Sequence, residues 1–226
     1  SLNVPLLTTD ADIAIDTRGL AEAPEIGSVL RAAGFTPGPN PGHWVNARDV
    51  AVDLMVVPHQ AGTAKATARA ARLSPHDKRT ARIARGLEPA LVDHVEITLT
   101  ALDSTDHRVS TVRVAGPAAL LTAKAIKLAE RLVQADNQPD RLKEKDALDA
   151  FRLLQAVETH VLAAGFASHH GDKHASAVTK EAIEVFRAHA SSPDGRIARL
   201  AAAAAQGDPT IAPSFAALVT TLLAVL

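Results

Sequence analysis

Short apolar runs interrupted by polar residues characterise the first half of the chain. These runs predict strands at residues 10–16, 43–46, 50–57, 95–102 and 108–114. Between the first two lies a helical pattern at residues 22–33. The first half therefore predicts a mixed sheet with a covering helix.

The pattern changes after Gly116 and Pro117, where helical periodicity with brief Pro, Gly, Asp and Ser breaks takes over. Helices are predicted at residues 118–134, 141–163, 176–189, 195–205 and 214–226. The fold class expected is therefore α/β (α+β), a mixed sheet followed by a C-terminal helical region. We expect two domains, residues 1–115 and residues 116–226.

Composition narrows the possible chemistry without selecting a function. The chain has 226 residues, 47% of them hydrophobic, which is enough for a substantial core, and its formal charge of -1 gives no overall basic field. The absence of cysteine excludes disulfides, thiolate catalysis and Cys-based metal sites, and it favours a cytoplasmic location. The apolar residues 215–226 are too few for a membrane span, which needs roughly 20 residues, so no membrane partner is expected.

Acidic residues interrupt two of the predicted strands. Asp10 and Asp12 are two positions apart, so a strand places both on one face, where they repel each other unless a divalent cation lies between them. Asp53 is the single acid of an apolar run and needs a partner, either a metal ion or a Lys or Arg, although an edge position facing solvent would also accommodate it. Together, Asp10, Asp12 and Asp53 predict a metal site.

Residues 65–85 are strongly basic, with Asp77 as the only acid. Lys65, Arg69 and Arg72 have four- and three-residue spacing, so a helix would place them on one face and present them to the phosphates of RNA. An ordinary solvated helix face explains the same spacing.

The acidic positions and two later segments carry a resemblance to a known family. The Asp-x-Asp pair followed by Asp53 resembles the acidic triad of nucleotidyltransferase-fold proteins. Residues 116–127, with Lys124 and Lys127, and the Lys-x-x-Asp-x-x-Asp segment of residues 143–154 are similar to the AbiEii-type branch, whose members include toxins of type IV toxin–antitoxin systems. The resemblance extends over residues 8–156.

This resemblance implies transfer of a nucleotide from an NTP, such as ATP, to an acceptor hydroxyl, with Mg²⁺ held by Asp10, Asp12 and Asp53. It implies nucleotide binding by Lys124, Lys127, Lys143 and Asp146. The simpler explanation for Lys124 is an ordinary exposed helix residue. For Lys143, Asp146 and Asp149 it is surface pairing at helical spacing, which is favoured for Asp149. The acceptor expected is RNA, in particular the 3′ end of tRNA, or else a protein side chain. A toxin role would bring a cognate antitoxin as partner.

Two other interpretations remain open. A nucleotidyltransferase-fold module without catalysis could bind nucleotide, RNA or a protein, because the phosphate-binding Gly-Ser turn of the family would lie at or before Ser1. The acids could also belong to an unrelated α/β scaffold.

The remaining notable residues predict structural roles. His169, His170 and His174 match no metal-site spacing and predict a solvated loop. Trp44 is expected in the core or at a sheet edge.

Overall fold

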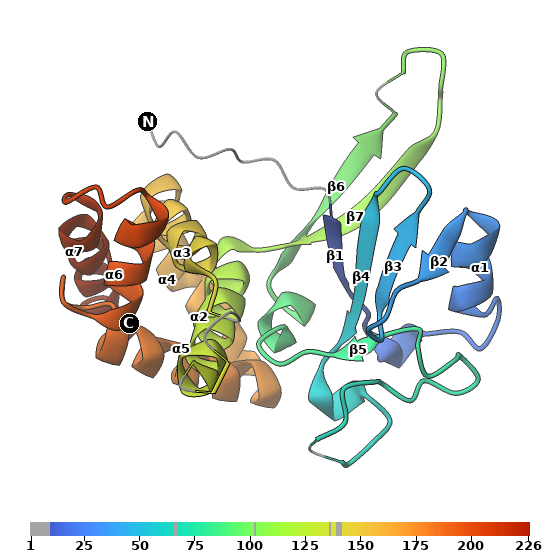
Figure 1. Ribbon diagram of the computed structural model, residues 1–226, viewed down its shortest axis with the longest axis horizontal. Helices are drawn as coiled ribbons and strands as arrows, with labels where there is room; N and C mark the ends of the chain where they lie inside the picture. The colour runs from blue at the N-terminus through green and yellow to red at the C-terminus, as the bar shows by residue number, and fades with distance from the viewer. Residues whose placement is uncertain (1–9, 66, 102, 136, 139–141) are drawn as a thin grey trace. The chain divides into compact units, whose positions relative to one another are not determined.

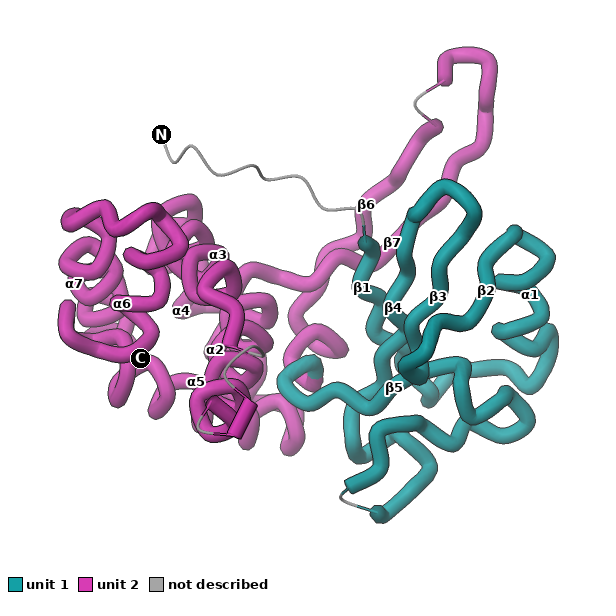
Figure 2. Tube along the Cα trace, in the orientation of Figure 1, with its two compact units in different colours: residues 1, 3–87 teal, residues 2, 88–226 magenta. Residues whose placement is uncertain are grey.

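The computed structural model describes residues 10–226 apart from 66, 102, 136 and 139–141. These residues form two compact units, unit 1 up to Leu87 and unit 2 from Glu88 to Leu226 (Figure 2). The expected fold class is confirmed, since a mixed sheet comes first and a helical region follows (Figure 1). The units divide after Leu87, earlier than the expected boundary after residue 115. The last two strands form a separate hairpin that belongs to unit 2. Gly116, just after this hairpin, donates a backbone hydrogen bond to the carbonyl of Asp93 just before it.

Unit 1 is built on a mixed sheet in the order β1-β4-β3-β2, with β5 also pairing with β4. β1 runs parallel to β4, and β3 runs antiparallel to it. The strands β2 and β5 are too short to show a sequence pattern and were not expected. The bounds are β1 Asp10–Ala14, α1 Ile26–Ala32, β2 Phe35–Pro37, β3 His43–Asn46, β4 Ala51–Val56 and β5 Arg82–Ile83.

Helix α1 covers one face of this sheet and starts later than the expected residue 22. The carboxylate of Glu25 caps its first turn, accepting from the backbone N–H groups of Gly27 at 2.9 Å and Ser28 at 2.6 Å. Ile26 of the helix packs against the buried side chains of the sheet, among which Trp44 is 1% exposed. Trp44 is therefore a core residue, as expected, and the residues alternating with this core point to the other face.

The described residues of the basic stretch form no helix, so Lys65, Arg69 and Arg72 share no helix face. Within residues 65–85, apart from residue 66, the chain is irregular except for the short β5 and a bridge between Ala70 and Arg82. A backbone hydrogen bond from Ala71 to Ala81 closes the stretch on itself, and bonds from Arg72 to Ala61 and from Ala84 to Val56 of β4 hold it in place. Leu73 is buried there. These long-range bonds replace the local helical bonds that an alanine-rich sequence favours.

Unit 2 contains the β6–β7 hairpin and a helical bundle. The single helix expected at residues 141–163 is wrong, because Val157 has an extended backbone and a new helix starts after Glu158. Residue 141 lies outside the described residues. The bounds are β6 His94–Thr100, β7 Val109–Ala115, α2 Pro117–Gln134, α3 Glu144–Ala156, α4 Thr159–Ser168, α5 Lys173–His189, α6 Arg196–Ala204 and α7 Ile211–Leu223.

Aromatic side chains from separate helices form the centre of the bundle. Phe151 of α3 and Phe215 of α7 are fully buried, with ring centroids 5.6 Å apart, and Phe166 of α4 is 1% exposed. The break at Val157 lets α3 bury Phe151 and α4 bury Phe166 in the same core. If both residues lay on one straight helix, they would be about 22 Å apart along its axis. Tertiary packing therefore decides this helix boundary.

His169 is also part of the bundle core rather than of a solvated loop, which corrects that expectation. Its ring is completely buried and lies 3.2 Å from Asp93 and 2.7 Å from the hydroxyl of Thr179. The carboxylate of Asp93 also accepts from the backbone N–H of Ala119 at 3.0 Å, so it caps the first turn of α2. The Asp93–His169 pair thus connects the residue before β6 to α2, to the turn at His169 and, through Thr179, to α5.

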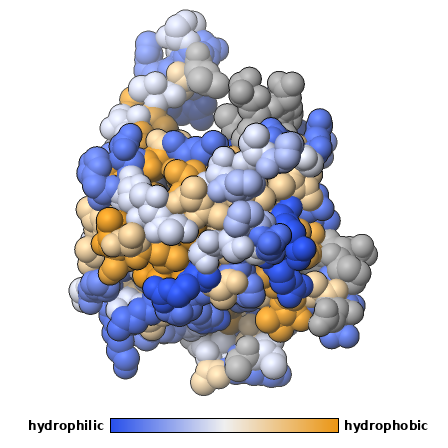
Figure 3. Space-filling view, turned by 90° about the vertical axis from the view of Figure 1, so that its left-hand side faces the viewer, coloured by the Kyte–Doolittle hydropathy of each residue, from blue (hydrophilic) through white to orange (hydrophobic). Residues whose placement is uncertain are grey.

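The surface is mixed in character. On the face drawn in Figure 3, hydrophobic residues are interspersed with hydrophilic ones. Among the described residues, no helix has the length and apolarity needed to cross a bilayer.

Candidate functional site

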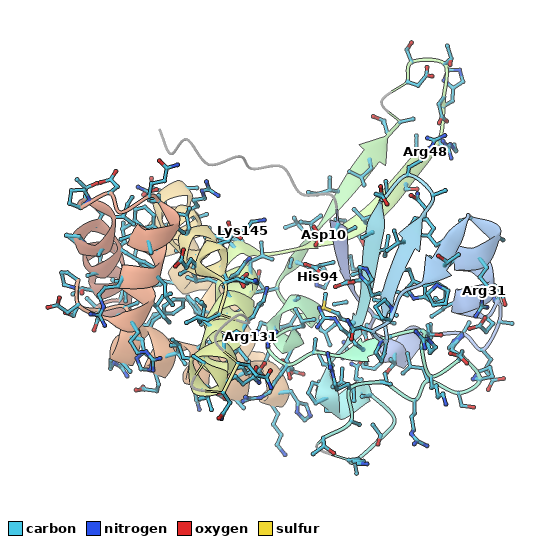
Figure 4. All side chains as sticks on the ribbon, viewed as in Figure 1. Asp10, Arg31, Arg48, His94, Arg131 and Lys145 are labelled. Carbon is cyan, nitrogen blue, oxygen red and sulfur yellow. The ribbon has the colours of Figure 1, made fainter. Side chains whose placement is uncertain are left out.

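The sheet of unit 1 brings two of the predicted acids side by side. Asp12 of β1 is the register partner of Asp53 of β4, and Asp53 is in turn the partner of His43 of β3. Register partners on neighbouring strands share a face, and strands lie about 4.8 Å apart. Asp12, Asp53 and His43 therefore form one row across three strands. Asp10, labelled in Figure 4, lies on the same face one repeat earlier, opposite Ala51.

Local sequence explains why this face is polar. Leu54 and Val56 of β4 belong to the core that α1 covers, so the intervening Asp53 and Met55 point the opposite way. Arg82 of β5 is paired with Met55 and reaches the same face. The strand alternation seen in the sequence thus separates core residues from charged ones.

Asp53 has the cationic partner that the sequence analysis required. Its Oδ1 lies 2.6 Å from Nδ1 of His43, and its Oδ2 lies 3.5 Å from a guanidinium nitrogen of Arg82. The side chain of Asp53 is 23% exposed, against 35% for His43 and 36% for Arg82. All three are accessible enough for a ligand to reach them.

Gly42 allows β3 and β5 to approach β4 at this point. Its φ is +78°, and a Cβ there would lie 2.3 Å from the carbonyl oxygen of Leu54 and 2.6 Å from the backbone nitrogen of Arg82. No other residue type fits such a position without displacing backbone. Gly42 therefore fixes the start of β3 and, with it, the position of His43.

The donor atoms of this face suit magnesium. No group of three or more His, Asp or Glu side chains is close enough to hold a metal ion in the part of the chain that the structure describes. Mg²⁺ seldom needs such a cage, because it is usually bound by one or two carboxylates together with substrate phosphates and water. The adjacent carboxylates of Asp12 and Asp53 fit an ion that is completed in this way.

In unit 2, the predicted residues Lys124, Lys127 and Asp146 come together between α2 and α3. Oδ1 of Asp146 accepts from the Lys124 ammonium at 3.2 Å and from the Lys127 ammonium at 2.9 Å. Lys124 also reaches Asp149 at 2.9 Å, and Asp149 lies 3.4 Å from Arg152. Pairing at helical spacing within α3 is therefore found for Asp149, through Arg152, whereas the lysine partners of Asp146 both belong to α2.

The charges of this cluster stabilise one another. Burial works against the charged forms, but the hydrogen bond to Asp149 and the charge of Asp146 raise the pKa of Lys124 above its ordinary value. In the same way, burial opposes ionisation of Asp146, but Lys127 and Lys124 lower the pKa of its carboxyl. Lys124, Lys127 and Arg152 thus meet two aspartates in this cluster.

The remaining predicted residues do not join either cluster. Lys143 is exposed at the N-cap of α3 without a side-chain capping bond. Lys65, Arg69 and Arg72 are exposed in the irregular segment of unit 1, so they can meet solvent phosphates even though they share no helix face.

His43 and Arg82 are site residues that the sequence analysis missed. The signal for His43 was present in the strand predicted at residues 43–46, where it alternates with the core residue Trp44. Arg82 gave no such signal, because it belongs to a two-residue strand in a basic stretch.

Known proteins add no family assignment to this geometry. Comparisons of the chain with protein-family models, with curated proteins and with solved structures found no match.

Proposed function

We propose that this chain is a magnesium-dependent nucleotidyltransferase, which moves a nucleotide from an NTP such as ATP to an acceptor hydroxyl. The observation that carries the proposal is the register pairing of Asp12 with Asp53 on the face of the unit 1 sheet opposite the core that α1 covers. Two adjacent carboxylates repel each other, and an Mg²⁺ ion shared with a triphosphate offsets that repulsion.

Each group has a chemical task in this reaction. The acceptor oxygen attacks the α-phosphorus and gives up its proton to solvent, the bond to the bridging oxygen breaks, and pyrophosphate leaves. Magnesium bound with Asp10, Asp12 and Asp53 would lower the pKa of the acceptor hydroxyl and neutralise the leaving group. Arg82 offsets the charge of Asp53, and the residues proposed to bind the nucleotide are Lys124, Lys127, Lys143 and Asp146.

The acceptor in this proposal is RNA, with the 3′ end of tRNA as the specific candidate. Lys65, Arg69 and Arg72 are exposed, and no hydrogen bond or ion pair of their side chains is seen among the described residues. Exposed cations of this kind bind phosphates by releasing counterions. A protein acceptor would not require them. Transfer to tRNA in the cytoplasm would suit a toxin that is controlled by an antitoxin.

A second candidate function is a module that binds nucleotide, RNA or a protein without catalysis. One observation favours it: both lysine ammonium groups of the unit 2 cluster are already engaged by Asp146. A triphosphate would have to compete with that carboxylate for them.

Transfer of label from NTPs separates the two functions. The protein is incubated with each α-³²P-labelled NTP, Mg²⁺ and total tRNA, and the assay is repeated with Asp12→Ala, Asp53→Ala and the control Asp194→Ala, which changes an exposed residue between α5 and α6. Catalysis predicts label on RNA that EDTA and both site variants abolish and the control retains. Binding of NTP or tRNA without any labelled product would support the non-catalytic module.

A further inference from the structure

The hydrogen bond between His43 and Asp53 suggests a role for His43 that goes beyond packing. We propose that His43 is a positioning residue, which holds the carboxylate of Asp53 in the orientation needed to bind a divalent cation beside Asp12. The inference rests on the proposed function, because it concerns the same metal site.

In the hydrogen bond between His43 and Asp53, the histidine is the donor and the carboxylate is the acceptor. An ionised carboxylate only accepts hydrogen bonds, so Nδ1 of His43, 2.6 Å from Oδ1 of Asp53, carries the donated proton. The hydrogen bond fixes the rotation of the carboxylate about its last bond. Oδ2 then lies 3.5 Å from Arg82, and each oxygen keeps lone pairs that can bind an ion.

Electrostatics explains why Asp53 needs such support. Like charges directly opposite each other on paired strands are destabilising, and Asp12 occupies that position. The donor on one side and the guanidinium on the other offset this repulsion. They hold the carboxylate of Asp53 in place beside Asp12.

Stability alone is a poor explanation for this arrangement. The core of unit 1 lies on the opposite face, and the side chains of His43 and Arg82 are about one-third exposed, at 35% and 36%. Partly exposed ion pairs contribute little to stability. Groups that bind metals are, by contrast, regularly oriented by hydrogen bonds from neighbours of this type.

The test measures cation binding rather than transfer. Free Mn²⁺ is counted by electron paramagnetic resonance while the full-length protein is titrated with Mn²⁺ alone and with Mn²⁺ and α,β-methylene-ATP, which cannot be turned over at the α-phosphorus. His43→Asn keeps an amide N–H near the place of Nδ1, whereas His43→Gln moves the amide towards the place of Nε2 and His43→Ala removes the donor.

Positioning predicts that His43→Ala and His43→Gln weaken Mn²⁺ binding about 10- to 100-fold, the usual effect of losing such a neighbour, while His43→Asn stays close to the wild type. His107→Ala, at an exposed histidine between β6 and β7, serves as the matched control and keeps wild-type affinity. Circular dichroism and the fluorescence of Trp44 verify that each variant is folded.

The outcomes separate this inference from the proposed function. Equal Mn²⁺ affinity in all variants, an Asn variant as weak as the Ala variant, or a wild-type protein that binds no Mn²⁺ overturns the positioning role. If the expected affinity pattern is found but no NTP gives a labelled product, nucleotide transfer fails and the positioning role stands.

Discussion

Asp93 provides the sharpest test of what holds unit 2 together. Its carboxylate accepts from the backbone N–H of Ala119 at 3.0 Å and lies 3.2 Å from Nε2 of the fully buried His169. Because the carboxylate only accepts, Nε2 of His169 carries the donated proton, and Nδ1 lies 2.7 Å from the hydroxyl of Thr179. Asp93→Ala leaves both the helix N–H and the imidazole N–H without their partner.

The cost follows from these two lost bonds. Losing a helix cap costs about 1 kcal/mol, and leaving a buried donor unpaired costs about 1–3 kcal/mol. We therefore expect Asp93→Ala to lower the free energy of unfolding by about 2–4 kcal/mol, or the melting temperature by about 10 °C for a unit of this size. Asp93→Asn keeps an acceptor and should fall between this variant and the wild type.

Urea unfolding followed by far-UV circular dichroism measures this loss, because unit 2 holds most of the helix. Asp194→Ala, at an exposed position, serves as the control and should stay within about 0.5 kcal/mol of the wild type. A midpoint for Asp93→Ala equal to that of the control would refute the role assigned to the buried Asp93–His169 pair.

The same pair predicts a dependence on pH. The hydrogen bond from His169 lowers the pKa of Asp93 below its ordinary value, against the opposing effect of burial. A carboxyl with a lowered folded-state pKa contributes stability above its unfolded pKa of about 3.9 and loses it as the pH falls towards the folded value. The difference in stability between wild type and Asp93→Asn should therefore shrink below about pH 4. A difference that stays constant from pH 6 to pH 3 would contradict this assignment.

Three further substitutions test the remaining structural arguments. Gly42→Ala should cost at least about 2 kcal/mol, because it combines a left-handed backbone with a clash against β4, and urea unfolding followed by Trp44 fluorescence measures it; wild-type stability would exclude the tight approach. Phe151→Ala should cost about 3–5 kcal/mol by opening a cavity against Phe215, and a loss below about 1 kcal/mol would contradict its core position. Asp146→Ala should cost about 2 kcal/mol in urea unfolding, since it leaves two lysines short of a partner, and an unchanged midpoint would mean that the ion pairs add no stability.

Much of the fold could be predicted from local patterns. The strand at residues 43–46 was predicted with the observed bounds, and β4 and α2 were predicted to within one residue at each end. Local sequence is sufficient there because alternation or helical periodicity coincides with a clear break, such as Gly116 and Pro117 before α2. It was insufficient at residues 65–85, where an alanine-rich composition favours a helix but bonds to distant strands determine the conformation.

The candidate site, too, was predicted in part from the sequence and decided in part by the tertiary structure. Period two alone places Asp10 and Asp12 on one face of a strand, and the apolar neighbours of Asp53 place it opposite a core. Which strands pair, and in which register, depends on contacts between residues far apart in the chain. The sequence therefore supplied the acids, but only the tertiary structure made Asp53 the neighbour of Asp12.

The partners of these acids were decided entirely by tertiary contacts. His43 and Arg82 lie on strands that meet β4 only in the folded sheet, and Lys124 meets Asp146 only when α2 packs on α3. A side chain's hydrogen-bond partner depends on distances of a few ångströms, which local periodicity does not specify. By itself, the sequence determined the types of element, the face on which each acid lies and the chemistry available. The tertiary structure decided which charges meet, because strand register and helix packing set those distances.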